Sequence, residues 1–406
     1  MNYILMAIPG FFVLITIELL ANKMKGTDYY RLNDGVNSLA MGMMSRITKI
    51  LYAVIPFSFY VYFYEDFALF SWEINVWTWL IAFVLYDLSY YWNHRIGHTM
   101  NVSWASHVVH HSSEEYNLTT ALRQTSVPNV IGWIFYIPIA LLGFPPWIIA
   151  TVGSLNLLYQ FWVHTQLIDR MPNWYEAIFV TPSNHRVHHA KNKIYVDKNY
   201  GGVFILWDRL FKTFQPELKE EKVVFGISIQ LSSWNPVWGN IHFLASLIKD
   251  AWRTSSWKDK LTLWFRRTGY RPADVEAQYP IVKSNEVVAK YDIELNSGIK
   301  GYIVAQFFFV VSGVILLMMQ APEMNHTQHF ALGLTLAFSL FSMGKVQESS
   351  SWAWIFECAK FSCALAVAVW LVPLGGIPVI GIGIFGLISL LLLALFNKQN
   401  SKLATA

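Results

Sequence analysis

Long apolar runs divide the sequence into segments of membrane-spanning length. Three of them come early in the chain, at residues 3–20, 50–64 and 76–92. Because a spanning helix needs about 20 apolar residues, the first and third runs predict one helix each, and the second predicts a short span. The run at 129–163 is too long for one span, and Pro145 and Pro146 interrupt it. It therefore predicts a helical hairpin that dips into the membrane and returns.

A polar stretch and four further apolar runs make up the rest of the chain. The polar stretch covers 165–298, and the apolar runs lie at about 301–320, 329–343, 352–372 and 377–396. With the hairpin counted as two segments, we expect an all-α polytopic membrane protein with about nine transmembrane or membrane-dipping helices. The predicted domains are N-terminal transmembrane helices at 1–75, a histidine-bearing domain at 76–298 and C-terminal transmembrane helices at 299–406.

The composition agrees with a membrane protein. The 406 residues are 54% hydrophobic and 14% charged, whereas soluble domains carry roughly 25% charged residues. The net charge of +4 is modest and the basic residues follow the predicted topology, so we expect no nucleic-acid partner. The two cysteines, Cys358 and Cys363, lie in the apolar C-terminal part and form no disulfide framework.

The distribution of lysine and arginine predicts the orientation in the membrane. The loop at 21–49 and the polar stretch at 165–298 are rich in these residues, whereas the loop at 65–75 has none. By the positive-inside rule the N-terminus is outside, and the C-terminus and the histidine motifs face the cytoplasm. We therefore expect a cytoplasmic helical cap on a bacterial inner membrane or an endoplasmic reticulum.

A tryptophan-rich segment lies at 224–272 within the polar stretch. Lysines and arginines alternate there with Trp234, Trp238, Trp252, Trp257 and Trp264. This composition is typical of helices that lie in the headgroup layer of a membrane. The alternative is a water-exposed helical subdomain with a few buried tryptophans.

Nine of the twelve histidines form a pattern. The first group contains His94, His98, His107, His110 and His111, the second contains His185, His188 and His189, and His164 stands between the groups. Residues three or four apart share one face of a helix, so each group can direct several imidazoles to one place. Helices packed in a bundle can bring such arrays together at one metal centre.

The ligand type indicates the chemistry. Imidazole binds zinc, copper, iron and nickel well, and nine histidines exceed the three or four ligands of a single zinc site. Sites at helix ends beside the hydrocarbon suit oxidation of a lipid chain, for which redox-inactive zinc is unsuitable. We therefore expect two iron ions with dioxygen as co-substrate. No G-x-G-x-x-G fingerprint is present, which implies an external electron donor.

The second ring nitrogen of a metal-bound histidine usually donates a hydrogen bond to a carboxylate or a carbonyl oxygen. Asp87 is the first candidate, because it lies in an apolar run seven residues before His94, where a charged group is usually functional. A pairing with Arg95 or an interfacial position is the alternative. Further candidates, which solvated or helix-capping roles would also explain, are Glu114, Glu115, Asn117, Arg123 and Gln124.

The histidine motifs resemble those of the fatty acid hydroxylase/sterol desaturase superfamily of membrane di-iron enzymes. Within it, the chain is similar to the branch that oxidises glyceryl ethers. The similar stretches are YDLSYYWNHRIGH, WASHVVHHSSEEYNLTTALRQ, HTQLID, PSNHRVHHA and NYGGVFILWDRLFKTF, with a weaker likeness in VFGISIQLSSWNPVW and WKDKLTLWFRRTGYRP. The resemblance covers roughly 80–272, and the C-terminal spans match only by general layout.

The resemblance implies a cytosol-facing di-iron site that hydroxylates the ether-linked carbon of a lipid, with tetrahydrobiopterin as a candidate reductant. It assigns eight clustered histidines as ligands and leaves His164 as a ligand or an outer partner. Two positions depart from the pattern: Thr99 stands where an acidic residue is usual, and Lys212 where glycine is usual. The first departure leaves the substrate and the reductant open.

Three alternatives remain. The chain could perform another reaction of the superfamily, as a hydroxylase or desaturase of sterols, carotenoids or acyl chains. It could be a metal transporter, although transporters place ionisable residues near the bilayer midplane, and these histidines gather at one face. An inactive scaffold would tolerate the loss of motif histidines, and none is missing.

Overall fold

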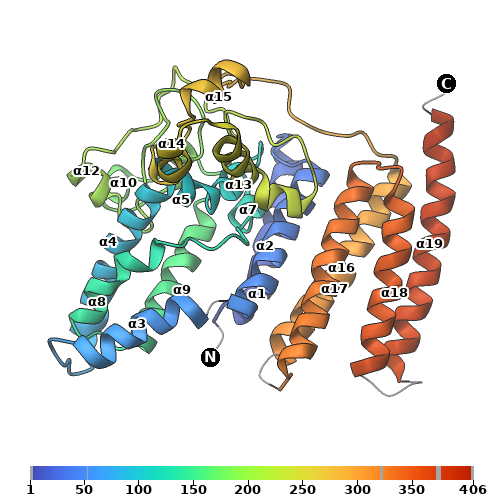
Figure 1. Cartoon of the computed structure of the whole chain (residues 1–406), viewed down its shortest axis with the longest axis horizontal. Coiled ribbons are helices and arrows are strands. Elements are labelled where there is room, and N and C mark those ends of the chain that lie inside the picture. The colour runs from blue at the N-terminus through green and yellow to red at the C-terminus, as the bar shows by residue number, and fades with distance from the viewer. Residues whose placement is uncertain (1–2, 53, 321–322, 372–375, 404–406) are drawn as a thin grey trace. The chain divides into compact units, whose positions relative to one another are not determined.

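The fold is entirely helical in the part of the chain described by this computed structural model, residues 3–52, 54–320, 323–371 and 376–403 (Figure 1). Two isolated bridges, Phe179 with Phe204 and Ala190 with Phe225, are its only β-type pairings within those ranges. The chain divides into two compact units. The first contains 1–31, 53–231 and 240–290, and the second contains 32–52, 232–239 and 291–406.

The first unit carries all nine motif histidines. Its elements are α1 Tyr3–Lys25, α3 Val54–Phe67, α4 Val76–Thr99, α5 Asn101–Ala105, α6 Val108–His111, α7 Leu118–Ala121, η1 Gly132–Tyr136, α8 Ile137–Leu141, α9 Pro146–Trp162, α10 Asn173–Ile178, α11 Pro182–His188, α12 Leu206–Leu210, α14 Trp257–Thr262, η2 Leu263–Phe265 and α15 Ala273–Gln278. Helix α13, Pro236–Arg253, belongs to this unit from Asn240 onward. Most of the helices between α4 and α12 are short, so many residues of this unit lie in loops.

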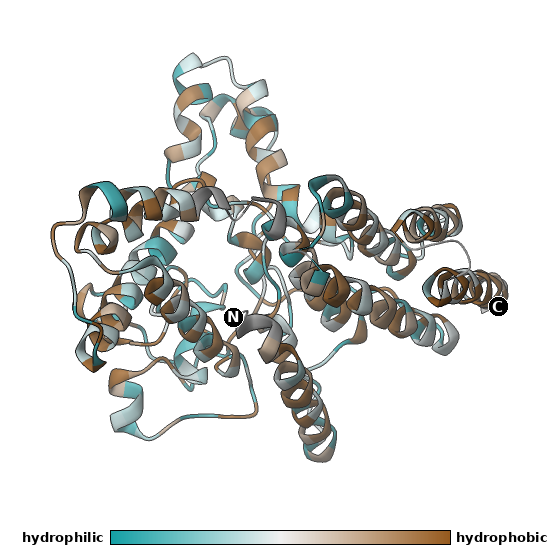
Figure 2. Cartoon of the chain, turned by 90° about the horizontal axis from the view of Figure 1, so that it is seen from below, coloured by the Kyte–Doolittle hydropathy of each residue, from teal (hydrophilic) through white to brown (hydrophobic). Residues whose placement is uncertain are grey.

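The second unit is a group of long helices. They are α2 Leu32–Tyr52, α16 Ser297–Gln320, α17 His326–Gln347, α18 Ala353–Leu371 and α19 Ile377–Leu403. Apolar residues cover most of α19, the helix that ends at the C-terminus in Figure 2. The predicted division into 1–75, 76–298 and 299–406 stays a prediction, because the two units are defined by packing alone.

Five helices in the described ranges are long and apolar enough to cross a membrane. These spans are Met6–Lys25, Ser297–Gln320, His326–Gln347, Ala353–Leu371 and Ile377–Phe396. They agree with the predicted first run and the four C-terminal runs. The run at 129–163 does break at its proline pair, because α8 ends at Leu141 and α9 begins at Pro146. The structure thus describes a multi-pass membrane protein.

The prediction of a loop over 21–49 was wrong, since α2 occupies Leu32–Tyr52. A search for apolar runs does not find this helix, because polar residues interrupt its sequence. Several of these polar residues are nevertheless buried, including Asn33, Asn37 and Ser45. Asn33 and Asn37 contact other elements of the second unit. The Asn33 carbonyl oxygen accepts a hydrogen bond from Gln347 at 3.0 Å, and Asn37 donates to the Trp234 carbonyl oxygen at 2.6 Å.

Helix α4 positions the first histidines. Asn75 caps its N-terminus by accepting hydrogen bonds from the backbone of Trp77 and Thr78, which satisfies amide groups that a helix start leaves free. The middle of α4 packs with α8 and α9 around a buried apolar cluster that includes Ala82 and Ile148. With α4 fixed in this way, His94 and His98 lie one turn apart near its C-terminal end.

Candidate metal centre

Five histidines from three helical segments converge in one group, named here the five-histidine cluster. Its members are His94 and His98 of α4, His107 and His111 at either end of the α6 turn, and His188 of α11. One ring nitrogen of each lies within 4.8 Å of the others. Four of the five residues are buried, and His107 is half-buried.

The remaining four motif histidines form a second group, the four-histidine cluster. It combines His110 of α6, His164 two residues after the end of α9, and His185 and His189 at α11. The i, i+3 and i+4 spacing therefore serves both clusters at once. His107 and His111 turn toward one cluster while His110 turns toward the other, and α11 divides its three histidines in the same manner.

In each cluster one ring nitrogen lies close to two others, which a single hydrogen bond does not explain. In the five-histidine cluster, Nε2 of His107 lies 2.9 Å from Nε2 of His94 and 3.1 Å from Nε2 of His111. In the four-histidine cluster, Nε2 of His185 lies 3.1 Å from Nε2 of His164 and 3.2 Å from Nε2 of His189. One ring nitrogen carries at most one proton, so a shared cation explains both arrangements better than a chain of hydrogen bonds.

Buried ring nitrogens without a hydrogen-bond partner also indicate a bound cation. Nε2 of His98 and Nε2 of His188 are buried and have no hydrogen-bond partner. An unpaired buried polar atom costs free energy, and such atoms commonly mark an ion or a functional site. Both belong to the five-histidine cluster, so the donor set fits a bound metal ion.

Backbone carbonyl groups fix the tautomer of four rings. Nδ1 of His94 lies 2.8 Å from the Tyr200 oxygen, and Nδ1 of His188 lies 3.0 Å from the Lys198 oxygen. Nδ1 of His110 and Nδ1 of His164 contact the oxygens of Arg123 and Gln160 at 3.0 and 2.7 Å. A carbonyl oxygen only accepts hydrogen bonds, so each Nδ1 carries the proton and each Nε2 presents a lone pair to its cluster.

Burial keeps these imidazoles neutral. It lowers the pKa of His94 to about 3 and that of His110 to about 4. Burial, followed by repulsion from neighbouring histidines, lowers the pKa of the other seven well below the ordinary value. A metal ion binds neutral imidazole, so both clusters are ready for a metal at neutral pH.

Comparison with known proteins agrees with this donor set. The model of the fatty acid hydroxylase family matches residues 79–213, which include all nine histidines. Human alkylglycerol monooxygenase is 38% identical over 318 residues, which are 77% of this chain and 70% of that protein. The zebrafish (Danio rerio) alkylglycerol monooxygenase is 36% identical over 360 residues, 86% of this chain and 78% of that protein.

The chain belongs to the alkylglycerol monooxygenase family. It is therefore a membrane lipid hydroxylase, and the predicted resemblance is confirmed. A more distant relative, the ornithine lipid hydroxylase OlsE of Rhizobium tropici, is 26% identical over 150 residues, 37% of this chain and 45% of that protein. No solved structure gives a significant match.

Asp87 lies outside direct contact with the histidine rings, which differs from the expected role as their hydrogen-bond partner. Its carboxylate is fully buried and accepts hydrogen bonds from Asn156 and from the Trp207 indole at 2.6 and 2.9 Å. It also accepts from the backbone amides of Val203 and Phe204. Asp87 thus holds the loop at 198–204, whose carbonyl oxygens contact His94 and His188.

The same loop depends on Asp208, which sequence reasoning missed. This buried carboxylate accepts hydrogen bonds from the backbone amides of Tyr200 and Gly201, both at 2.8 Å. Burial raises the pKa of Asp208 to about 6. Asn199 adds a second anchor, with φ of 56° and a side chain that donates to the Asn184 oxygen at 2.9 Å.

The other polar candidates surround the clusters through loops and turns. Glu114 accepts from Gln230 at 2.7 Å, and Glu115 forms ion pairs with Arg31 and Lys290. Asn117 caps α7, and Gln124 donates to the Ala121 oxygen at 3.1 Å. Arg123 contacts a ligand candidate directly, since its carbonyl oxygen lies against His110.

Lys212 and Thr99 are the two positions that depart from the family pattern. The structure explains why glycine is usual at the first and shows what the second side chain contacts. Lys212 has φ of 61°, a left-handed conformation that glycine adopts without strain, which accounts for the usual glycine. Thr99 is the last residue of α4, and its hydroxyl donates to the Arg95 carbonyl oxygen at 2.9 Å. The Thr99 side chain is therefore bonded to its own helix.

Glu18 is a further residue that sequence reasoning overlooked. It lies in the first apolar run, and the rarity of carboxylates in such runs was the available signal. The side chain is buried and accepts hydrogen bonds from the Leu118 amide at 2.8 Å, from Thr165 and from Tyr30. Because Thr165 follows His164, Glu18 helps to fix the chain beside the four-histidine cluster.

Proposed function

We propose that the chain oxidises the ether-linked carbon of an alkylglycerol at two iron ions held by the nine histidines. Dioxygen would be the co-substrate, and an external donor would supply the electrons, with tetrahydrobiopterin as the candidate reductant. The observation that carries this proposal is the pair of clusters with inward-facing, neutral ring nitrogens. The names of the relatives supply the substrate class.

The reaction balances as a monooxygenation. A C–H bond becomes C–OH with one oxygen atom, and the other leaves as water with two protons and two electrons from the donor. The product carbon bears both a hydroxyl group and the ether oxygen, so it breaks down to an aldehyde and glycerol. Iron supplies the redox chemistry with dioxygen that a C–H bond of this kind requires, which zinc cannot supply.

The chain's own residues hold the centre in a fixed geometry. Carbonyl oxygens of the loop at 198–204 orient His94 and His188, and those of Gln160 and Arg123 orient His164 and His110. Outer hydrogen bonds of this kind raise the basicity of a ligand and fix its direction. Burial of the rings excludes water, which protects a reactive centre from side reactions.

We also propose that the histidine domain forms a cap on the cytoplasmic face. The support is the alternation of basic and acidic loops along the sequence. In addition to the five long spans, α3, the part of α4 at 76–92 and the two halves of the segment from η1 to α9 would lie within the membrane. This gives about nine membrane segments in all. These shorter elements are apolar, with Gly132–Leu141 long enough for a partial crossing.

The tryptophan-rich segment at 224–272 would lie in the headgroup layer beside the cap. Its apolar side chains are unusually exposed, with Trp252 at 85%, Trp257 at 75% and Leu261 at 68%. Lys260 lies 5.7 Å from the centre of the Trp257 ring, so apolar and basic groups share this surface. A surface of that kind favours the boundary between lipid tails and phosphate groups.

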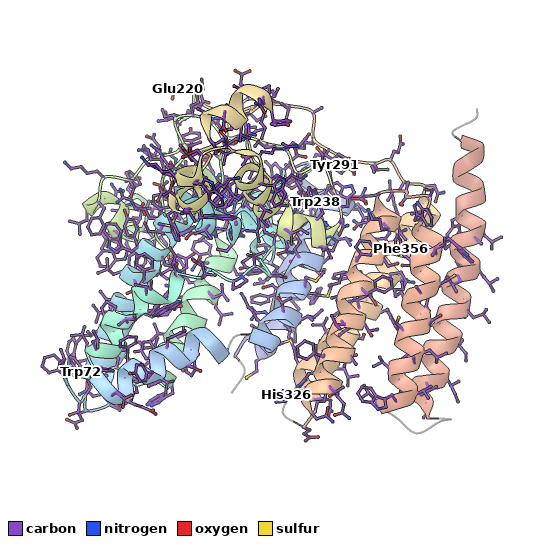
Figure 3. All side chains as sticks on the ribbon, viewed as in Figure 1. Trp72, Glu220, Trp238, Tyr291, His326 and Phe356 are labelled. Atoms are coloured by element: carbon purple, nitrogen blue, oxygen red, sulfur yellow. The ribbon has the colours of Figure 1, made fainter. Side chains whose placement is uncertain are left out.

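Cysteine labelling tests the orientation. We expect Ser71→Cys and Glu323→Cys to react with an impermeant thiol reagent added outside intact cells, and Lys219→Cys to remain unlabelled. Cys358 and Cys363 would first be replaced by alanine. Trp72 and Glu220, next to two of these positions, lie at opposite ends of the first unit (Figure 3). Labelling of Lys219→Cys from outside, with Ser71→Cys protected, would contradict the cytoplasmic assignment.

The substrate test uses purified, iron-loaded protein with a long-chain glyceryl ether, oxygen and a reduced pterin. We expect release of a fatty aldehyde that stops when either oxygen or the pterin is omitted. The match to the fatty acid hydroxylase family makes hydroxylation of an acyl chain the second candidate. If the ether persists with every pterin while an acyl lipid gains a hydroxyl group, the ether assignment is wrong and the second candidate holds.

A further inference from the structure

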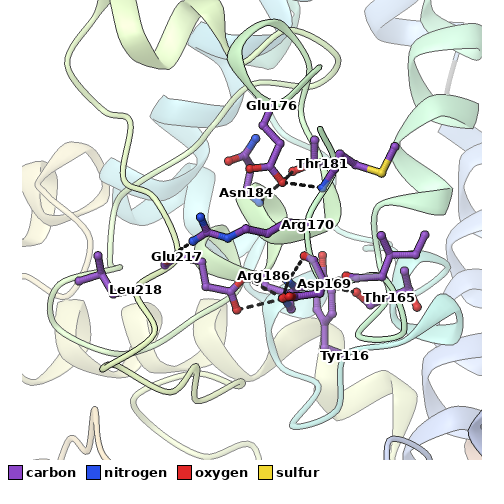
Figure 4. Close-up of polar contacts among 12 residues, drawn as sticks. Tyr116, Thr165, Asp169, Arg170, Glu176, Thr181, Asn184, Arg186, Glu217 and Leu218 are labelled. Carbon is purple, nitrogen blue, oxygen red and sulfur yellow. Dashed lines mark hydrogen bonds and ion pairs between the residues drawn. The ribbon is translucent and has the colours of Figure 1, made fainter. Parts of the chain in front are cut away.

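Arg186 lies between two ligand candidates but turns away from both clusters. It belongs to α11, with His185 before it and His188 two residues after it. The residue is 5% exposed. Its guanidinium group reaches the loop at 165–169 and the side chain of Glu217, as the close-up in Figure 4 shows.

Every nitrogen of this guanidinium group makes a hydrogen bond. Nη1 donates to the carbonyl oxygens of Thr165 and Ile168 at 3.1 and 2.7 Å, and Nη2 donates to that of Asp169 at 2.6 Å. Nε lies 3.1 Å from both carboxylate oxygens of Glu217, and Nη2 lies 2.7 Å from one of them. Only the planar fork of arginine can make this set of contacts.

The loop held by Arg186 begins directly after His164. His164 belongs to the four-histidine cluster, whereas α11 supplies His185 and His189 to it. Arg186 therefore connects the two segments whose histidines must meet in that cluster. The five-histidine cluster takes no residue from the loop, and its α11 member, His188, has a separate support in the Lys198 carbonyl oxygen.

Helix α11 itself has anchors that do not involve Arg186. Thr181 caps its N-terminus, and Asn199 donates to the Asn184 carbonyl oxygen at 2.9 Å. The loop after His164 would keep the Glu18 contact at Thr165. Three of its carbonyl oxygens would lose their bonds with Arg186, so loss of the Arg186 contacts would free this loop more than the helix. Glu217 is also the nearer counter-charge of Arg186, at 2.7 Å, whereas the exposed carboxylate of Asp169 lies 3.9 Å away.

We propose that Arg186 and Glu217 form a clamp that positions His164 and so controls metal binding at the four-histidine cluster alone. The proposal rests on the proposed function, because it requires that both clusters bind a metal. Arg186 and Glu217 are positioning residues, since neither touches the ring nitrogens that face the metal. The clamp makes the two metal sites separable by mutation although they share α6 and α11.

The test measures metal bound per chain in the full-length protein, with Arg186→Lys and Glu217→Gln as the variants. Substitution of residues that support a ligand without touching the metal typically weakens metal affinity about 10- to 100-fold. We therefore expect each variant to keep about one metal where the wild type holds about two. The matched control is Arg170→Gln. Arg170 also donates to Glu217, but to its backbone oxygen from an exposed position, and its loss should leave both metals in place.

Two ligand variants identify which metal is lost. His164→Ala removes a ligand of the four-histidine cluster, and His98→Ala removes one of the five-histidine cluster. Adding Arg186→Lys to His164→Ala should cause no further loss, whereas adding it to His98→Ala should remove the remaining metal. This dependence on the background distinguishes a positioning role from general destabilisation, which would lower the metal content in both.

Equal losses in the two backgrounds, or two metals retained in both clamp variants, would overturn the clamp while leaving the proposed function intact. A wild-type chain that binds fewer than two metals would contradict the proposed function itself, and the clamp with it. If Arg186→Lys does not fold, Glu217→Gln decides, because it keeps the side-chain volume and removes only the charge.

Discussion

Replacing His98 or His185 with alanine removes lipid oxidation and leaves the protein folded. Each residue belongs to a different cluster, so each variant loses one ligand of one metal. Outer partners alone are worth about 10- to 100-fold in metal affinity or activity, and we expect the loss of a ligand to reduce activity by at least 100-fold. The two variants should be equally inactive, because the account requires both metals.

The folded state should tolerate both changes. Nε2 of His98 and Nδ1 of His185 are buried without a hydrogen-bond partner, so alanine removes no structural bond from these atoms. The control is His326→Ala, an exposed histidine at the start of α17 that is labelled in Figure 3. Thermal unfolding in detergent checks the fold. Activity within twofold of wild type in either cluster variant would contradict the assignment.

Acid should unfold the histidine domain of the metal-free protein well above the pKa values of its buried imidazoles. In the folded state burial lowers the pKa of His94 to about 3 and of His110 to about 4. In the unfolded chain these groups protonate near pH 6.5. The unfolded state therefore binds more protons between these limits, and the free energy of unfolding falls as the pH decreases.

The expected effect is large because nine groups contribute. Each histidine costs up to about 1.4 kcal/mol for every pH unit below about 6.5, while a typical domain is stable by only 5–15 kcal/mol, to order of magnitude. We expect tryptophan fluorescence of metal-free protein to report loss of structure between about pH 6 and pH 5. Metal-loaded protein should resist to lower pH, because protons must then displace the metal.

An unfolding midpoint that stays constant from pH 7.5 down to pH 5 would contradict this account of the buried neutral rings. The same burial should lower the pH at which protons compete with the metal. For free imidazole this competition would begin near pH 6.5, whereas the folded clusters should keep their rings neutral below that value.

Sequence spacing predicted that the histidines converge, but not how they divide. Intervals of three and four residues place His107, His110 and His111 on neighbouring faces of a helix. This spacing allows His110 to join the same cluster as His107 and His111, or a different one. The assignment of His110 to the four-histidine cluster depends on the position of α9, which brings His164 to it. No local pattern encodes that long-range packing.

The outer supports were harder to predict, for a physical reason. Four rings contact backbone carbonyl oxygens, and a backbone group leaves no trace in the residue type. Asp87 was recognised as important from its place in an apolar run, yet the backbone amides that it binds lie in a loop more than a hundred residues away. Asp208 and Arg186 looked like ordinary polar residues, because only the folded chain buries them.

Apolar runs located the long spans well and the amphipathic elements poorly. The four C-terminal runs and the proline break at 145–146 agree with the helices found. Helix α2 was missed because its buried face contains asparagine and serine, which a search for continuous apolar residues excludes. Polar residues that pack against other helices are invisible to such a search.

The metal content of gently purified full-length protein decides whether the two clusters hold two iron ions. We expect iron approaching two equivalents per chain, reduced to about one in His98→Ala and about one in His164→Ala, and none when both changes are combined. A single tightly held zinc ion that is unaffected by either substitution would contradict this expectation.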